Sequence, residues 1–108
     1  MKDIIWIDTA REDLTGFPAD AKQRAGYQLR RVQAGQVPND WKPMPEVGAG
    51  VIEIRIHVEG EFRGFDVAKF EEGVYVLHAF QKKTQKTSQA DIKLGKRRYN
   101  EVLKLRRR

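Results

Sequence analysis

Cationic side chains, imidazoles and a carboxylate recur at short spacing in the second half of this 108-residue sequence. RNA carries its own nucleophile, the 2′-hydroxyl, so cleavage of its backbone needs a base, an acid for the leaving oxygen and cations for the phosphorane-like transition state. Arginine and lysine supply such cations, and histidine exchanges protons near neutral pH. The residue types therefore suit metal-independent cleavage of RNA, and the candidate catalytic residues are Arg55, His57, Arg63, Lys82 and Lys83.

Several other kinds of site are excluded or weakly supported. The sequence has no cysteine, which excludes a disulfide scaffold, a thiolate metal site and a cysteine nucleophile. It has no glycine-rich phosphate loop and no His-x-x-x-His pair, and its single serine, Ser88, stands in a helix-capping context. His57 and His78 fall on different predicted strands, where they either converge for acid–base catalysis or are hydrogen-bonded strand residues. We expect no metal site and no cofactor.

Positive charge is concentrated at the C-terminal end of the sequence. The chain has 21 basic and 15 acidic side chains, a formal net charge of +6. Residues 1–80 hold 10 basic and 13 acidic side chains, a balance of −3, whereas residues 81–108 hold 11 and 2, a balance of +9. A phosphate backbone or an acidic partner is the natural complement of such a segment, although a run of charge is also typical of a solvated helix face.

The first half of the sequence predicts a strand and two helices. Residues 3–7 are rich in isoleucine and tryptophan and suit a strand, and Thr9 with Glu12 forms a capping-box pattern. A helical hairpin over residues 9–35 follows, and its second helix has one apolar stripe, formed by Ala21, Ala25, Leu29 and Val32. Prolines and glycines recur in residues 36–50, which are therefore predicted to be a loop that cannot join the middle of a sheet.

The second half predicts three consecutive antiparallel strands. From residue 51 the period becomes two, so that isoleucines line one face while Glu53, Arg55 and His57 are expected to point away from the core. Short turns at residues 59–61 and 71–73 then separate strands over residues 62–70 and 74–80.

A closing helix follows the capping pattern of Ser88 with Asp91. Its predicted apolar stripe is Ile92, Gly95, Tyr99 and Val102, so Tyr99 is interpreted as a core residue. Its other faces carry Lys93, Lys96, Arg97, Arg98 and Lys104. Residues 106–108 are expected to fray.

This order, β-α-α-β-β-β-α, places a helical hairpin and a C-terminal helix on an antiparallel sheet, which is the α+β class. The length predicts a single domain over residues 1–108. There is no apolar run of about 18 residues, so we expect no membrane association and a cytoplasmic protein.

Residues 74–87 read Val-Tyr-Val-Leu-His-Ala-Phe-Gln-Lys-Lys-Thr-Gln-Lys-Thr and run into a helix that opens near Gln89. This run resembles a segment of the phage-derived branch of the RelE/HigB toxin superfamily, in which a strand ends in Leu-His-x-Phe-x-Lys-Lys-Thr-x-Lys-Thr before the last helix. Residues 50–55 and 62–65 are similar to two earlier strands of that family, so the resemblance covers essentially the whole chain in order. It implies a RelE-like, microbial-RNase-like fold.

The resemblance also implies a function, namely the toxin of a type II toxin–antitoxin pair. Members are metal-independent endoribonucleases that cut mRNA, usually on the ribosome, and are neutralised by a small antitoxin that commonly has a helix-turn-helix domain. Arg63 matches the strand arginine that contacts the scissile phosphate. Lys82 and Lys83 match the basic position at the end of the last strand, and Arg55 matches a frequently basic or polar position.

One departure from the family leaves the acid and the base open. Some members carry a tyrosine or histidine after the last strand, where this chain has only Thr84 and Thr87. This branch therefore relies on lysine and His57 if it is catalytic. The remaining basic residues are expected to bind RNA, including ribosomal RNA, and are Lys86, Lys93, Lys96 and Arg97.

The sequence leaves two alternative functions open. The missing acid–base pair and the strongly basic end also suit a non-catalytic module that binds RNA or a protein partner. A structural protein of phage origin is the third interpretation.

Overall fold

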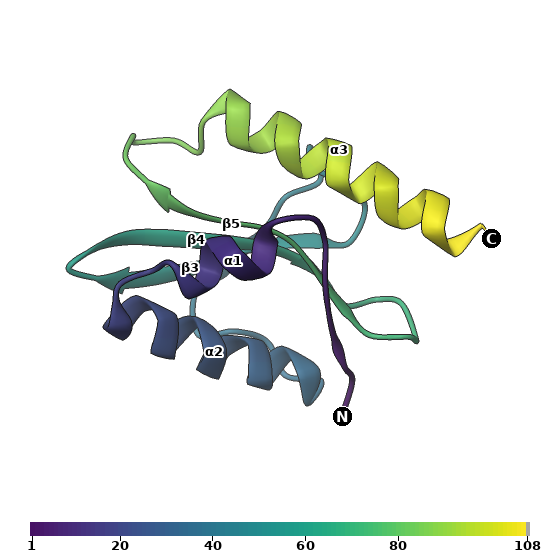
Figure 1. Ribbon diagram of the computed structural model, residues 1–108, viewed down its shortest axis with the longest axis horizontal. Coiled ribbons are helices and arrows are strands. Elements are labelled where there is room, and N and C mark those ends of the chain that lie inside the picture. The colour runs from purple at the N-terminus through teal and green to yellow at the C-terminus, as the bar shows by residue number, and fades with distance from the viewer. Residues whose placement is uncertain (108) are drawn as a thin grey trace.

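A five-stranded sheet lies between helices in the computed structural model, which describes residues 1–107 (Figure 1). The elements in chain order are β1 (Ile4–Trp6), α1 (Ala10–Thr15), α2 (Ala19–Gln33), β2 (Trp41–Pro43), β3 (Val51–Val58), β4 (Gly60–Val67), β5 (Val74–Lys82) and α3 (Gln89–Arg106). The strand order is β1-β5-β4-β3-β2, with β1 parallel to β5 and the other neighbours antiparallel. The predicted α+β class is confirmed, and the predicted order gains one strand.

The added strand, β2, corrects the prediction that residues 36–50 form only a loop. Its three residues pair with residues 52–54 of β3 at the outer edge of the sheet. Pro43 has no N–H to donate, and an edge strand tolerates this because one row of its backbone groups has no neighbouring strand. The prolines therefore exclude a central strand, as predicted, but allow this edge strand.

β4 and β5 reach further toward one end of the sheet than predicted. Gly60 has a φ of +123°, a conformation that favours glycine, and it allows the chain to reverse tightly after Val58. As a result Glu61, which was expected in the turn, is a strand residue, and it lies opposite Lys82 at the end of β5. This longer pairing brings both side chains into the candidate site described below.

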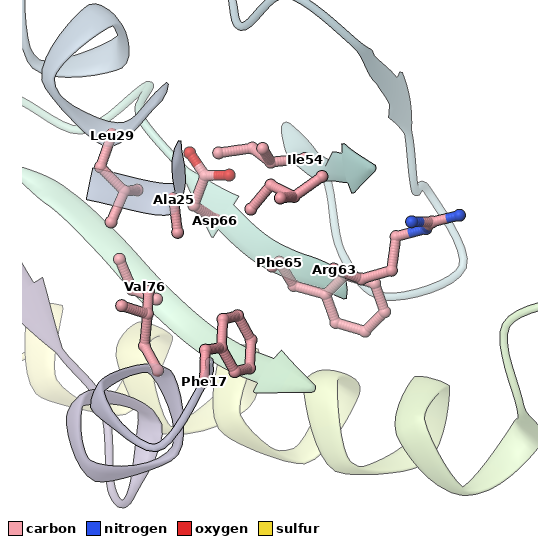
Figure 2. Close-up of a pocket in the computed structure, with 11 residues that line it drawn as sticks. Phe17, Ala25, Leu29, Ile54, Arg63, Phe65, Asp66 and Val76 are labelled. Carbon is pink, nitrogen blue, oxygen red and sulfur yellow. The ribbon is translucent and has the colours of Figure 1, made fainter. Parts of the chain in front are cut away.

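One face of the sheet packs against α1 and α2. The predicted stripe of α2 is buried there, together with Ile54, Ile56, Phe62 and Val76 from the strands. Asp66 of β4 lies in this apolar layer with 1% of its surface exposed. Neither oxygen of its carboxyl group has a hydrogen-bond partner within residues 1–107, and Figure 2 shows the group among Ala25, Leu29 and Ile54. Burial raises the pKa of Asp66 well above its usual value of 3.8.

The opposite face packs against α3. The helix begins after Ser88, whose hydroxyl accepts a hydrogen bond of 3.1 Å from the backbone N–H of Asp91, as the capping pattern predicts. Gly95, Tyr99 and Val102 of the predicted stripe are buried. A Cβ atom on Gly95 would lie 2.8 Å from the ring of Phe65, so the glycine lets α3 approach the sheet closely.

A β-bulge in β5 changes which side chains face α3. His78 pairs with Phe65 and Val76 pairs with Asp66, so Leu77 is an extra residue between the two pairs. Before the bulge Tyr75 and Leu77 face the α3 side. After it the alternation is inverted, and His78, Phe80 and Lys82 take that side.

Two charged residues are placed differently from the predictions. Arg98 was expected on an outer face of the last helix, but it is 5% exposed and donates a hydrogen bond of 2.9 Å to the carbonyl of Leu77. It also donates to the hydroxyl of Thr9, which makes no capping bond to α1. Glu53 was expected to point away from the core and is fully buried.

The expectation of a frayed tail is also wrong for Arg106. This residue ends α3, donates a hydrogen bond of 2.7 Å to the carboxylate of Glu72, and stacks 3.9 Å from the ring centre of Phe70. Arg107 is the C-cap of the helix, and Arg108 lies outside the described residues.

Candidate functional site

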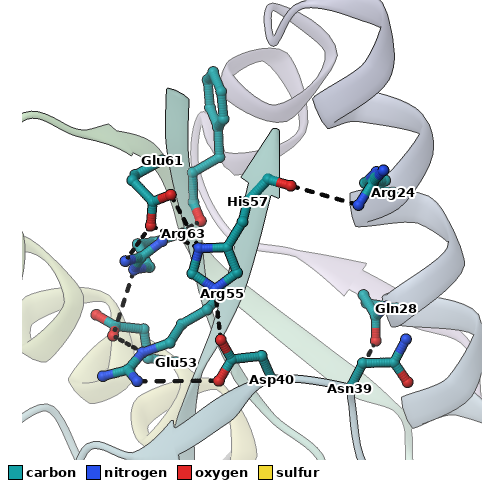
Figure 3. Close-up of polar contacts among 10 residues, drawn as sticks. Arg24, Gln28, Asn39, Asp40, Glu53, Arg55, His57, Glu61 and Arg63 are labelled. Carbon is teal, nitrogen blue, oxygen red and sulfur yellow. Dashed lines mark hydrogen bonds and ion pairs between the residues drawn. The ribbon is translucent and has the colours of Figure 1, made fainter. Parts of the chain in front are cut away.

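On the side of the sheet that faces α3, the ends of β3 and β4 carry polar side chains (Figure 3), and Lys82 at the end of β5 lies beside them. The strand register places Arg55 opposite Arg63, and places Glu61 between His57 on one neighbouring strand and Lys82 on the other. The bulge in β5 is what brings Lys82 to this side. Four of the predicted catalytic residues therefore lie together, namely Arg55, His57, Arg63 and Lys82.

A buried carboxylate holds the two arginines side by side. The Oε1 atom of Glu53 lies 3.4 Å from Nε of Arg55 and 3.7 Å from Nε of Arg63. Its Oε2 atom accepts a hydrogen bond of 2.6 Å from the hydroxyl of Thr87. Glu53 therefore fixes both guanidinium groups and also ties the basic segment after β5 to the sheet.

His57 lies between two carboxylates at the exposed edge of this cluster. Its Nε2 atom is 2.5 Å from Oδ2 of Asp40, and its Nδ1 atom is 2.8 Å from Oε1 of Glu61. Imidazole can donate from both nitrogens only when it is protonated. The hydrogen bonds to Asp40 and Glu61 accordingly raise the pKa of His57 above 6.5, and the bonds from His57 and Arg63 lower the pKa of Glu61 below 4.5.

The edge of the sheet positions Asp40. The buried side chain of Gln28 on α2 accepts a hydrogen bond of 2.8 Å from the backbone N–H of Asn39. The carbonyl of Asp40 then accepts a bond of 2.9 Å from the backbone N–H of Arg55. These two bonds hold the residues just before β2 against β3, so that Asp40 reaches His57.

Two hollows lie beside this cluster and share Lys82 and Gln85. The first, about 470 Å³, is lined by Glu61, Arg63, Lys82, Lys83, Thr84 and Gln85. The second, about 340 Å³, is lined by residues of β2, β3 and the start of α3 and includes the cations Lys42, Arg55 and Lys86. The predicted phosphate-binding residues Arg63, Lys82 and Lys83 thus converge on the first hollow.

Arg63 lies at the floor of that hollow instead of on an open face. It is 4% exposed, and its guanidinium donates a hydrogen bond of 3.0 Å to Glu61 and another of 3.0 Å to the carbonyl of Phe62. Its Nε atom has no hydrogen-bond partner among residues 1–107. An anion that binds Arg63 must therefore enter the hollow, between Glu61 and the two lysines.

The residues predicted to bind RNA are divided by the structure. Lys86 is exposed and lines the second hollow. Lys93, Lys96 and Arg97 are exposed along α3 and line neither hollow.

His78 does not join His57. It is 8% exposed, its Nε2 atom lies 2.7 Å from Oδ1 of Asp91, and its ring stacks on Phe80 with 4.5 Å between ring centres. Desolvation lowers the pKa of His78 below 6.5, and Asp91 opposes this effect. Of the two interpretations that the sequence left open, His78 is the hydrogen-bonded strand residue.

Sequence reasoning missed three polar residues of the cluster, namely Asp40, Glu61 and Thr87. Asp40 precedes a strand that was not predicted, and Glu61 was assigned to a turn. The alternation from Glu61 through Arg63 to Phe65 was a usable signal, because it places Glu61 and Arg63 on one face if the strand starts earlier. The structure shows no group of three or more metal-ligating side chains over residues 1–107.

Comparison with known proteins matches the chain to one family. The model of the family described as "Phage derived protein Gp49-like" matches residues 12–100, which include every residue of the polar cluster and of both hollows. No curated protein matches the chain. None of the helices within residues 1–107 combines the length and apolar composition that a membrane span needs.

Proposed function

Since the chain belongs to the Gp49-like family of phage-derived proteins, we propose that it is a RelE/HigB-type toxin of a type II toxin–antitoxin system. In this proposal it is a metal-independent endoribonuclease that cleaves mRNA on the ribosome, in the cytoplasm, as one domain over residues 1–108. A small antitoxin with a helix-turn-helix domain neutralises it. The observation that carries the proposal is the hollow in which Arg63 forms the floor and Lys82 and Lys83 form the wall.

The cations in and beside this hollow have distinct roles in the proposal. Arg63 binds the scissile phosphate, because a guanidinium fork matches two phosphate oxygens. Lys82 and Lys83 stabilise the negative charge that grows on the phosphorane-like transition state. Arg55 and His57 assist from the neighbouring strand, and neither a metal nor a cofactor takes part.

The outer cations dock the RNA in the proposal. Lys86 contacts the strand beside the hollow, while Lys93, Lys96 and Arg97 attract the ribosome or its RNA through α3. These contacts are sequence-tolerant because phosphate carries no base information.

Growth of cells in which the gene is induced tests the proposal. Induction of the natural protein should stop growth, and Lys82→Ala with Lys83→Ala should relieve the arrest. Neither side chain makes a hydrogen bond or ion pair within the described residues, so the double variant should keep its circular dichroism spectrum and its unfolding midpoint. Lys22→Ala with Arg30→Ala removes the same charge from exposed positions of α2 and should remain toxic. A folded Lys82/Lys83 variant that remains fully toxic contradicts the proposed site.

Arg63 needs a gentler substitution because it is buried. Arg63→Lys keeps the positive charge but loses the planar fork, so we expect cleavage to fall while the fold persists. RNA sequencing of cleaved ends, normalised to the amount of soluble protein, measures this fall.

A non-catalytic RNA-binding module is the second candidate, and one observation favours it. Carboxylates in the free protein already pair with Arg55, Arg63 and His57, whereas no ion pair within residues 1–107 involves Lys82, Lys83 or Lys86. The lysines are thus available to bind phosphate, while the charges of the other three residues are already balanced. Fragments with 2′,3′-cyclic phosphate ends in a translating extract support the nuclease. RNA binding without such fragments supports the binding module.

A further inference from the structure

Cleavage at the hollow requires a group that accepts the proton of the 2′-hydroxyl. The cations of the proposed site bind phosphate or donate protons, and both ring nitrogens of His57 already lie within hydrogen-bond distance of carboxylates. The residues that line the hollow are one carboxylate, three cations, a threonine and a glutamine. Glu61 is therefore the side chain in the wall of the hollow that is suited to accept a proton.

The position of Glu61 also suits this task. Its Oε1 atom accepts a hydrogen bond of 3.0 Å from Nη2 of Arg63, so a phosphate held by Arg63 lies next to the carboxylate. Its side chain is 43% exposed, so it is reachable from the hollow. Lys82 lies directly opposite Glu61 across β4 and β5, which places an acceptor and a donor on facing strands.

We propose that Glu61 is the general base of the ribonuclease reaction, an inference that rests on the proposed function. The carboxylate of Glu61 takes the proton of the 2′-hydroxyl as the 2′-oxygen forms its bond to phosphorus. The bond from phosphorus to the 5′-oxygen breaks, and that oxygen takes a proton from the ammonium group of Lys82. The products are a 2′,3′-cyclic phosphate and a free 5′-hydroxyl, and solvent returns Glu61 and Lys82 to their starting charges.

Substrate binding strengthens the base. In the free protein His57 and Arg63 both donate to Glu61, which lowers the pKa of the carboxyl and keeps it ionised. A phosphate that binds Arg63 competes for the same guanidinium and adds negative charge beside Glu61. Both effects raise the affinity of Glu61 for a proton at the moment when the 2′-hydroxyl is in place.

Two variants test this assignment because they change His57 in the same way. Glu61→Gln and Asp40→Asn each remove one of the two carboxylates that hold His57, and the two carboxylates are almost equally exposed, at 43% and 44%. Asp40 lines neither hollow. Glutamine keeps an oxygen that accepts from Arg63, so Glu61→Gln keeps the size of the side chain and this hydrogen bond while it removes the basic carboxylate.

We expect Glu61→Gln to lower kcat on an RNA oligonucleotide bound to the ribosome by roughly a hundredfold to ten-thousandfold, the usual contribution of a general base, with KM unchanged or lower. Asp40→Asn should change kcat by less than about tenfold. The acidic limb of the pH profile of kcat/KM should disappear in Glu61→Gln and remain in Asp40→Asn. Both variants should bind the 2′-deoxy form of the oligonucleotide, which cannot be cleaved by this route, at least as tightly as the natural protein.

The outcomes separate the two proposals. Equal losses in both variants, or near-natural cleavage by Glu61→Gln, overturn the assignment of Glu61 and leave the ribonuclease in place. Absence of cleavage by the natural protein on RNA and in a translating extract overturns the proposed function, and the role of Glu61 with it.

Discussion

Arg55 and Arg63 lie directly opposite each other on β3 and β4, and like charges in such a pair repel. The fully buried Glu53 lies beside both and offsets the repulsion with a single negative charge. A buried charge that loses its counter-ion is strongly destabilising, so the three side chains depend on one another. The phosphate-binding residues of the proposed nuclease are thus part of the structural core of this end of the sheet.

Glu53→Gln should therefore destabilise the fold markedly. The substitution leaves two buried or half-buried guanidinium groups without their shared counter-ion, and we expect a loss of about 3 kcal/mol in the free energy of unfolding. Urea unfolding followed by tryptophan fluorescence measures this loss. Thr87→Val removes only the hydrogen bond to Glu53 and should cost about 1.5 kcal/mol. Equal and small losses in the two variants would show that Glu53 does not balance the arginines.

The pKa values of the two histidines should lie on opposite sides of 6.5. Asp40 and Glu61 raise the pKa of His57. The stability that these contacts contribute is therefore fully present below pH 6.5, and it is lost as the pH rises through the pKa of His57 in the folded protein. Burial lowers the pKa of His78, so below pH 6.5 the unfolded chain gains a proton that the folded protein does not hold, and stability falls. Chemical shifts of the two imidazole rings over pH 4–9 measure both values. Asp40→Asn should lower the pKa of His57 and leave the pKa of His78 unchanged.

At the scale of the elements, α2 covers a buried carboxyl group that has no hydrogen-bond partner within the described residues. An unpaired polar group in an apolar layer costs about 1–3 kcal/mol, and an apolar group of similar shape removes this cost. Asp66 therefore weakens the packing of α2 on the sheet, even though this packing supports Asp40 through Gln28.

Asp66→Val should stabilise the protein by about 1–3 kcal/mol at neutral pH. The pKa of Asp66 is raised in the folded state, so its contribution to stability is fully present below its usual value of 3.8 and is lost as the pH rises from there through the folded-state value. Asp66→Asn should remove this part of the pH dependence. Thermal unfolding of the three proteins from pH 3 upward is the measurement, and identical pH profiles would contradict the expectation.

The elements that carry strong periodic patterns were predictable, and the charged residues inside them were less so. The stripes of α2 and α3 and the alternation in β3 identify buried faces because apolar spacing reports packing directly. Burial of charge was not predictable because it depends on partners that are distant in the sequence. Glu53 and Arg63 balance each other's charge, and Arg98 donates a hydrogen bond to a backbone carbonyl of β5. The edge strand β2 is too short to have a periodic signal of its own.

The cations of the candidate site were predictable, but the contacts that hold them together were not. Arg63, Lys82 and Lys83 do converge on one hollow, whereas Lys93, Lys96 and Arg97 do not reach it. Lys82 reaches this hollow because of the bulge at Leu77, and no residue type in β5 predicts that bulge.

At the scale of the whole molecule, exposed lysines and arginines follow the end of β5 and continue along α3. Binding of single-stranded nucleic acid to such a surface releases counter-ions, and the logarithm of the affinity falls with the logarithm of the salt concentration by about 0.7 for each phosphate neutralised. The salt dependence therefore counts the cations that contact the strand.

Lys82→Ala with Lys83→Ala should reduce this slope by about 1.4, because two contacts are lost. Lys22→Ala with Arg30→Ala, on the α2 side of the sheet, should leave the slope unchanged although the net charge falls equally. Fluorescence anisotropy of a labelled 2′-deoxy oligonucleotide over a range of salt concentrations measures the slopes. Equal reductions in the two variants would indicate that net charge alone, and not this face, governs binding.

The bulge in β5 also constrains how the length of the chain can change. Because Leu77 is one extra residue, the bulge and the number of residues between Val74 and Lys82 together decide on which side of the sheet Lys82 emerges. Loss of Leu77 would remove the bulge and restore regular alternation, so Lys82 would stay opposite Glu61 on the side of α3. Loss of a second residue before Lys82 would turn Lys82 toward α2 and separate it from Arg63. The strand can therefore lose the bulge residue, but a further deletion must be matched by an insertion before Lys82, whereas the segment after Lys83 can vary in length without changing which face the strand presents.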